Sequence, residues 1–211
     1  MYTLDKRLTT LLAFILLLAF AGPVLAHHPM GGQTPETALQ GLLSGFGHPI
    51  IGLDHLAFII VAGFLAYGAN RKLRFVLPLV FILATLAGTG IHLAALNIPF
   101  AESFVAGTVL LAGVLLILPG FAKTRLTTLL FAVAGIFHGY AYGESIIGAE
   151  QTPLFAYLVG FAVIQYTLMA LGLMAMARLQ NRNAAMRHMT VRISGGAAVA
   201  IGCLFLFGSL A

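Results

Sequence analysis

Six long apolar runs, separated by short polar gaps, restrict this chain to a bundle of helices in a membrane. Of its 211 residues, 60% are hydrophobic and only 8% are charged, whereas soluble domains carry about 25% charged residues. In hydrocarbon the backbone must satisfy its own hydrogen bonds, and a helix of about 20 residues does so while crossing the bilayer. The runs lie at about residues 49–68, 74–96, 102–119, 126–148, 153–177 and 192–210. We therefore predict an all-α integral membrane protein with a six-helix transmembrane bundle.

The first 26 residues have the pattern of a secretory signal peptide. Lys6 and Arg7 precede an apolar core at residues 8–21, and small residues follow at 24–26. A retained first helix is the alternative, but a Gly-Pro pair makes the apolar run short for a membrane span. We expect cleavage after Ala26.

Residues 27–47 are predicted to form a periplasmic lead-in before a transport domain at residues 48–211. His27 and His28 would begin the mature chain, and two imidazoles beside a free amine are a candidate accessory metal site. A chance pair of surface histidines explains them equally well. A short helix is predicted over residues 38–46 at the membrane surface, and Gly45 and Gly47 are expected to loosen the chain just before His48.

The charges of the gaps predict the orientation of the bundle. All eleven basic residues lie near the N-terminus or in three alternate gaps between the apolar runs. The charged residues of the other gaps are only Glu102 and Glu150. The basic residues are Lys6, Arg7, Arg71, Lys72, Arg74, Lys123, Arg125, Arg178, Arg182, Arg187 and Arg192. Because basic gaps remain in the cytoplasm, we expect both mature termini on the outer side of a bacterial cytoplasmic membrane. The net charge of +5 then reflects topology in the lipid bilayer, and no nucleic-acid partner is expected.

Residues 48–55 place two imidazoles and a carboxylate at the start of the first span. Ionisable groups in hydrocarbon are expensive, so they indicate a site or a pathway. His48 and His55 are seven residues apart, and a regular helix would put both on one face, with Gly52 between them. Imidazole together with the carboxylate of Asp54 suits nickel, cobalt, zinc or iron. The alternative is that each polar side chain only joins two helices by a hydrogen bond.

The fourth span carries a second polar stretch, Phe-His-Gly-Tyr-Ala-Tyr-Gly-Glu-Ser, which begins at residue 137. Gly135, Gly139 and Gly143 form a stripe of small residues at a spacing of four, which allows a neighbouring helix to pack closely. His138 and Tyr142 lie on the adjacent stripe. His138 is a candidate metal ligand, with a hydrogen-bonded interior histidine as the alternative.

Several polar residues gather in the outer half of the predicted bundle. Four of the seven histidines and two of the six acidic residues lie there, and they include His92 in the second span and Glu144 in the fourth. Gln165 lies about halfway along the fifth span and faces either the pathway or a neighbouring helix. Gln165 and Tyr142 are candidate accessory residues of the metal site. This one-sided distribution predicts a funnel that opens to the outside.

With these features the sequence resembles the HupE/UreJ family. The resemblance rests on a signal peptide, six spans, a His-Pro-x4-Asp-His stretch at the first span and a Phe-His-Gly stretch in the fourth. It implies a small permease for nickel, or in some members cobalt, linked to hydrogenase, urease or cobalamin needs. It also implies that His48, Asp54, His55 and His138 handle the metal.

The second motif departs from the family pattern, Phe-His-Gly-x-Ala/Val-His-Gly-x-Glu. Tyr142 replaces the second histidine, Ser145 occupies the glutamate position, and Glu144 comes one residue early. Glu144 then joins the site of His138 only if the helix unwinds at Gly143; otherwise it serves the mouth of the path. The departure makes cobalt at least as credible a substrate as nickel.

These observations predict a secondary permease that imports a divalent transition metal, and not an enzyme. His48, Asp54 and His55 would receive the ion, His138 would take it next, and His92 would complete or orient the ligand shell. Mild acid should slow uptake, because neutral imidazole is the ligand. No prosthetic group is expected; Ni2+ or Co2+ is the cargo. Energy coupling and oligomeric state stay open.

Three other classes compete with the permease. An intramembrane metalloenzyme would use the same His, Asp and Glu groups, but the chain lacks His-Glu-x-x-His. A b-type haem protein would need axial histidines on facing spans. A purely structural subunit would leave the polar residues of the outer half unexplained.

Overall fold

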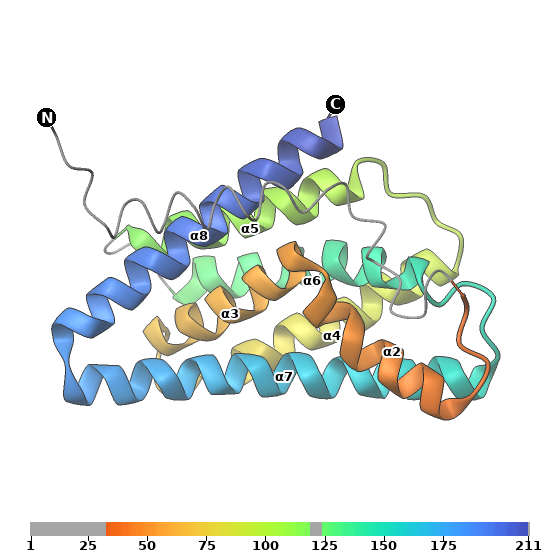
Figure 1. Cartoon of the computed structure of the whole chain (residues 1–211), viewed down its shortest axis with the longest axis horizontal. Coiled ribbons are helices and arrows are strands. Elements are labelled where there is room, and N and C mark those ends of the chain that lie inside the picture. The colour runs from red at the N-terminus through yellow and green to blue at the C-terminus, as the bar shows by residue number, and fades with distance from the viewer. Residues whose placement is uncertain (1–32, 119–123, 211) are drawn as a thin grey trace, which may run out of the picture.

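The computed structural model describes residues 33–118 and 124–210, and all regular structure in these segments is helical (Figure 1). The predicted signal peptide, with His27 and His28, lies outside the described residues. In order, the helices are α2 (Ala38–Ile51), α3 (Leu53–Gly68), α4 (Val76–Leu93), α5 (Ala101–Ile117), α6 (Thr124–Glu144), α7 (Gln151–Arg182) and α8 (Ala184–Leu210).

Most of these helices have the length and composition of membrane spans. Helices α4, α6, α7 and α8 each qualify alone, and α2 with α3 qualifies as a fifth span that is bent by 79° at its break. Helix α5 is apolar but has only 17 residues. An all-helical, multi-pass membrane protein is therefore confirmed, whereas the count of six spans depends on whether α5 crosses the membrane.

A capping box starts α2. The side chain of Thr37 accepts the N–H of Gln40, and the Gln40 side chain accepts the N–H of Thr37. Two otherwise unpaired backbone donors are satisfied in this way, which sets the helix start at Ala38.

The structure extends the first helix past its predicted end. Helix α2 continues to Ile51, and the chain breaks at Gly52 and not at Gly45 and Gly47. The reason is that Gly45 faces α7, where a Cβ atom would overlap the carbonyl oxygen of Tyr157. This glycine lets two helices approach closely, so it holds α2 along α7 and does not loosen the chain.

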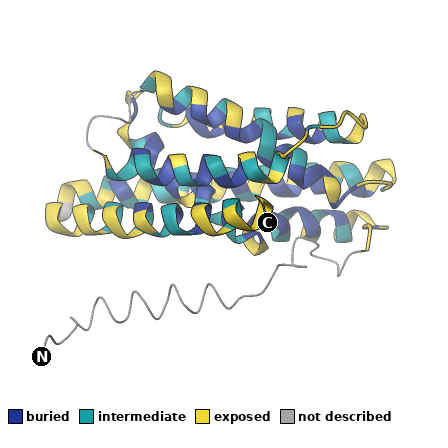
Figure 2. Ribbon diagram, turned by 90° about the horizontal axis from the view of Figure 1, so that it is seen from above, coloured by how far each residue is buried: buried dark blue, intermediate teal, exposed yellow. Residues whose placement is uncertain are grey.

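Helix α3 lies at the centre of the bundle. It contacts each of the other described helices, while α2 packs on α7, α4 on α6 and α5 on α8. The largest apolar core surrounds α3 and includes Phe58, Ile59, Ala62 and Leu65, all at most 1% exposed. Figure 2 shows the buried residues along the inner faces of the helices and the exposed ones outside.

Large apolar side chains also cover much of the outer surface. Leu83, Leu129, Phe155 and Phe207 are each at least 60% exposed. Extensive apolar surface on the outside of a helical bundle is what contact with lipid requires.

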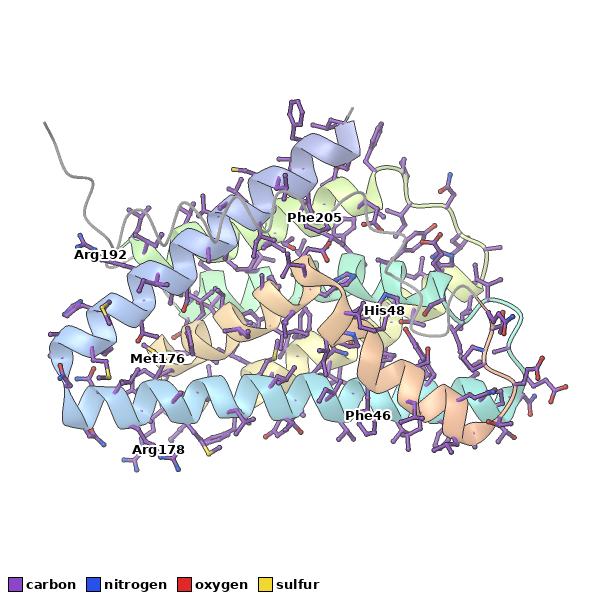
Figure 3. All side chains as sticks on the ribbon, viewed as in Figure 1. Phe46, His48, Met176, Arg178, Arg192 and Phe205 are labelled. Atoms are coloured by element: carbon purple, nitrogen blue, oxygen red, sulfur yellow. The ribbon has the colours of Figure 1, made fainter. Side chains whose placement is uncertain are left out.

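The two ends of the bundle differ in charge. Glu102, Glu144 and Glu150 lie where α5 begins, α6 ends and α7 begins, at the end called here the acidic end. Arg71, Lys72, Arg178 and Arg192 lie at the opposite basic end, where Figure 3 labels Arg178 and Arg192. The same figure places His48 inside the bundle, near the meeting of α2 and α3.

Candidate functional site

The break between α2 and α3 positions the first histidines. Gly52 closes α2 by donating its N–H to the carbonyl oxygen of His48 at 3.1 Å. A Cβ atom at position 52 would come within 2.6 Å of Cδ2 of His55, so only glycine leaves room for this ring. The prediction that one regular helix aligns His48 and His55 is wrong, but the bend still brings the two ring centroids to 5.8 Å.

Asp54 lies in the first turn of α3, directly after the break. Its Oδ1 accepts the backbone N–H of His55 at 2.8 Å, and the side chain is 1% exposed. A carboxylate at a helix N-terminus is favoured by the helix dipole, which helps to hold this charge inside the bundle. Figure 1 shows that the break lies about midway along the bundle.

The predicted partner from α6 reaches the same place. Nδ1 of His55 lies 2.8 Å from Nδ1 of His138, and the rings are 4.9 Å apart. Nε2 of His138 lies 3.1 Å from Oγ1 of Thr108 on α5. The structure therefore brings together His48, Asp54, His55 and His138, each at most 2% exposed; these four residues are called the histidine cluster.

The hydrogen bonds assign the protons of the His55–His138 pair. The Thr108 hydroxyl donates to the carbonyl oxygen of Val105 at 2.7 Å, so it accepts the Nε2–H of His138. A neutral His138 then has its lone pair on Nδ1 and accepts the Nδ1–H of His55. The lone pair of His55 is left on Nε2.

Two hydroxyl groups hold His48. Its Nδ1 lies 3.0 Å from Oγ of Ser145 and 3.2 Å from Oη of Tyr157. Both hydroxyl groups can also donate to the carbonyl oxygen of Tyr142, which lies 3.1 Å from Oγ of Ser145 and 2.9 Å from Oη of Tyr157. The Ser145 hydroxyl also lies 3.1 Å from Oη of Tyr157. In the arrangement where Tyr157 donates to the carbonyl and Ser145 donates to that carbonyl or to Tyr157, Nδ1 of His48 donates to Ser145 and the His48 lone pair lies on Nε2, the same tautomer as His55.

Tyr142 fills the space between the two histidines of the broken span. Its ring centroid lies 5.0 Å from that of His48 and 4.5 Å from that of His55. The side chain is fully buried, and its Oη has no hydrogen-bond partner among the described residues. Tyr142, predicted as an accessory residue, therefore lines the histidine cluster.

A layer of phenylalanines closes the basic-end side of the cluster. Phe58, Phe81 and Phe131 are fully buried, and their ring centroids are 5.1 to 6.4 Å apart. The His138 ring lies 4.7 Å from Phe58 and 5.7 Å from Phe81. We call these three rings the aromatic plug. The aromatic plug forms an apolar barrier between the histidine cluster and the basic end.

His92 and Glu144 do not join the histidine cluster. They line a pocket of about 340 Å³ at the acidic end, together with Phe100, Glu102, Tyr140 and several smaller side chains. The His92 ring lies 4.3 Å from that of Tyr140. No cluster residue lines this pocket, and the cluster is almost fully buried. The predicted funnel therefore does not reach the cluster in this conformation.

The three glycines of α6 face α4 at close range. A Cβ atom at Gly139 would overlap the carbonyl oxygen of Thr85, and one at Gly143 would come within 2.6 Å of Cβ of His92. At Gly135 it would come within 2.5 Å of Cβ of Ala84. This contact fixes the position of His138 relative to the rest of the bundle.

The cluster is compact but is not a preformed metal cage. Within residues 33–118 and 124–210, no three His, Cys, Asp or Glu side chains are arranged to bind one metal ion together. The short bond between His55 and His138 explains this, because each Nδ1 is turned toward the other. Metal binding through both rings requires these two atoms to separate.

Sequence reasoning missed Thr108, Tyr157 and Glu102. Thr108 and Tyr157 are single polar residues in apolar runs, where such residues are common, and their partners come from other helices. Glu102 was seen only as a gap residue. An acidic residue at the end of a span was the available signal for its pocket.

Comparison with known proteins identifies the family of the chain. The family model described as HupE / UreJ protein matches residues 15–205. Protein HupE of Rhizobium leguminosarum bv. viciae is 27% identical over 203 residues, which cover 96% of this chain and 98% of that protein. No solved structure matches the chain. The chain belongs to the HupE/UreJ family, a family of transporters linked to metal uptake for hydrogenase and urease.

Proposed function

We propose that this protein is a secondary permease that imports a divalent transition metal, nickel or cobalt, through the histidine cluster. The observation that carries the proposal is the convergence of three imidazoles and a carboxylate at a break in a membrane span. Discontinuous helices place polar groups and helix ends at the midplane of many transporters. Buried ionisable groups at such a place indicate an ion pathway.

The chemistry of the cluster supports a borderline divalent ion. The tautomers argued above place the lone pairs of His48 and His55 on Nε2, and neutral imidazole is a common ligand for nickel, copper, zinc and iron. The Asp54 carboxylate adds a negative charge that offsets part of the charge of the ion. His138 becomes a ligand through Nδ1 once its bond to His55 opens.

The path runs from the acidic end to the basic end. By the positive-inside rule the basic end faces the cytoplasm, so ions would enter at the pocket of His92, Glu102 and Glu144. They would then reach the histidine cluster and leave past the aromatic plug. The buried position of the cluster corresponds to a state that is closed on both sides. Weak binding at successive sites, with no tight cage, is what release requires.

Radiolabelled metal uptake tests this proposal directly. Cells without their own nickel and cobalt importers would express wild type, His55→Ala or His138→Ala. The control is His188→Ala, an exposed residue near the start of α8 at the basic end. We expect wild type and the control to take up nickel or cobalt. In both cluster variants, uptake of that ion should fall at least about tenfold. No uptake of either ion by abundant wild-type protein would refute the proposal and move the metalloenzyme forward.

A further inference from the structure

Gln165 lies on α7 between the stretches that α2 and α3 pack against. On one side of the break, Gly45 of α2 packs on the backbone of Phe161; on the other, Gly63 of α3 packs on the backbone of Met169. Gln165 is midway between these two contact points on α7. Its side chain is fully buried, as are those of the two residues one turn away on either side.

The hydrogen bonding of Gln165 fixes which way its amide points. One atom of the amide lies 2.9 Å from the carbonyl oxygen of Phe161, and because a carbonyl only accepts, that atom is the donor Nε2. The other atom is therefore Oε1. It is buried and has no hydrogen-bond partner in the described part of the chain. Buried oxygens of this kind are rare in folded proteins, so this one needs an explanation.

The groups around the break are suited to a cation. The last carbonyl groups of α2 carry the negative end of its dipole. Apart from that of His48, which accepts the N–H of Gly52, they have no hydrogen-bond donor within their own helix. Asp54 follows directly in α3. Oη of Tyr142 is a second buried oxygen without a partner, and the Tyr142 ring lies 5.6 Å from that of Phe161, the residue to which Gln165 is bonded.

We propose that Oε1 of Gln165 is a ligand of the transported divalent metal when the ion occupies the break between α2 and α3. This inference rests on the proposed permease function and adds a specificity-determining residue to it. A neutral amide oxygen extends the ligand shell beyond the imidazoles without adding charge that would retain the ion. The alternative role is structural: Gln165 would only join α7 to its neighbours.

Stability and metal binding separate the two roles. The purified full-length protein in detergent would be compared with Gln165→Leu, which removes the unpaired oxygen at nearly constant volume, and with Gln165→Glu, which keeps an oxygen. Thr167→Ala is the matched control, because Thr167 is exposed on the same helix and bonds only within it. Cobalt and nickel binding would be measured by equilibrium dialysis, and thermal unfolding would be measured without metal.

For the ligand role we expect metal-free Gln165→Leu to unfold at or above the wild-type temperature, because loss of an unpaired buried polar atom is neutral or stabilising. Its metal affinity should fall about tenfold, while Gln165→Glu binds at least as tightly as wild type and the control is unchanged. Unchanged affinity of Gln165→Leu, or weakened binding by Gln165→Glu, would overturn the inference. If the wild-type protein bound neither cobalt nor nickel, and His55→Ala gave the same result, the proposed permease function would be overturned as well.

Discussion

His55 joins the two halves of the histidine cluster. Its Nδ1 bonds to His138, its backbone N–H donates to Asp54, and its ring packs on Tyr142. The position of this ring depends on the missing Cβ atom at Gly52. Residues that orient His55 and His138 should therefore affect transport without touching the ion.

Thr108 is such a positioning residue. Its hydroxyl accepts from Nε2 of His138 and donates to Val105, which fixes the His138 tautomer. Thr108→Val keeps the shape but leaves a buried N–H without an acceptor, so we expect metal uptake at limiting concentration to fall about tenfold. The uptake assay would include Thr128→Val as a control, since Thr128 bonds only to its own helix. Equal uptake by both variants would show that Thr108 does not orient His138.

The sequence was sufficient to single out four residues that the structure then brings together. His48, Asp54, His55 and His138 are conspicuous because ionisable side chains in apolar runs are rare. Thr108 was not identifiable, because threonine is ordinary in membrane helices and its importance depends on the position of α6. For His92, the sequence predicted the span and the depth of the residue in the membrane. It did not predict that the side chain faces a pocket apart from the histidine cluster.

At the scale of elements, the broken span is the main departure from the predicted bundle. Gly41, Gly45, Gly47 and Gly52 look alike in sequence, and any of them was a credible break. What distinguishes them is tertiary contact: Gly41 and Gly45 face the backbone of α7, while Gly52 faces the His55 ring. Periodicity and hydropathy found the apolar runs, but neither records which glycine approaches another helix.

The pair of α4 and α6 gives a test of packing at this scale. We expect Gly139→Ala to destabilise the protein by about 1–3 kcal/mol, because the new methyl group would overlap the backbone of Thr85 and force the helices apart. Gly90→Ala on the exposed face of α4 has no atom within 4 Å and should be neutral or slightly stabilising. Thermal unfolding in detergent would measure both. Equal unfolding temperatures would contradict the close contact of α4 with α6.

At the scale of the whole molecule, the distribution of charge distinguishes the two ends of the bundle. Acidic residues gather at one end and basic residues at the other, and the histidine cluster with the aromatic plug lies between them. Hydropathy predicted the membrane location, which the structure confirms. The number of crossings depends on one short helix, because length alone does not decide whether α5 spans.

Helix α5 is expected to cross the membrane. It extends from the acidic end to the basic end, packs along α8 and contacts the central α3. Its 17 residues measure about 25 Å, slightly less than the hydrocarbon core of about 30 Å, a mismatch that local thinning of the bilayer can absorb. Reporter fusions on either side of α5 test this directly.

Two reporters would be used: a phosphatase that is active only outside the cytoplasm, and a fluorescent protein that folds only inside it. Each would be fused in turn after Asn97, within residues 119–123 and after Ala211. If α5 crosses, the first and last positions give phosphatase activity and the middle position gives fluorescence, because basic gaps remain inside. If α5 does not cross, the positions on its two sides report the same compartment. The acidic and basic ends would then not lie on opposite sides of the membrane as the proposed path requires.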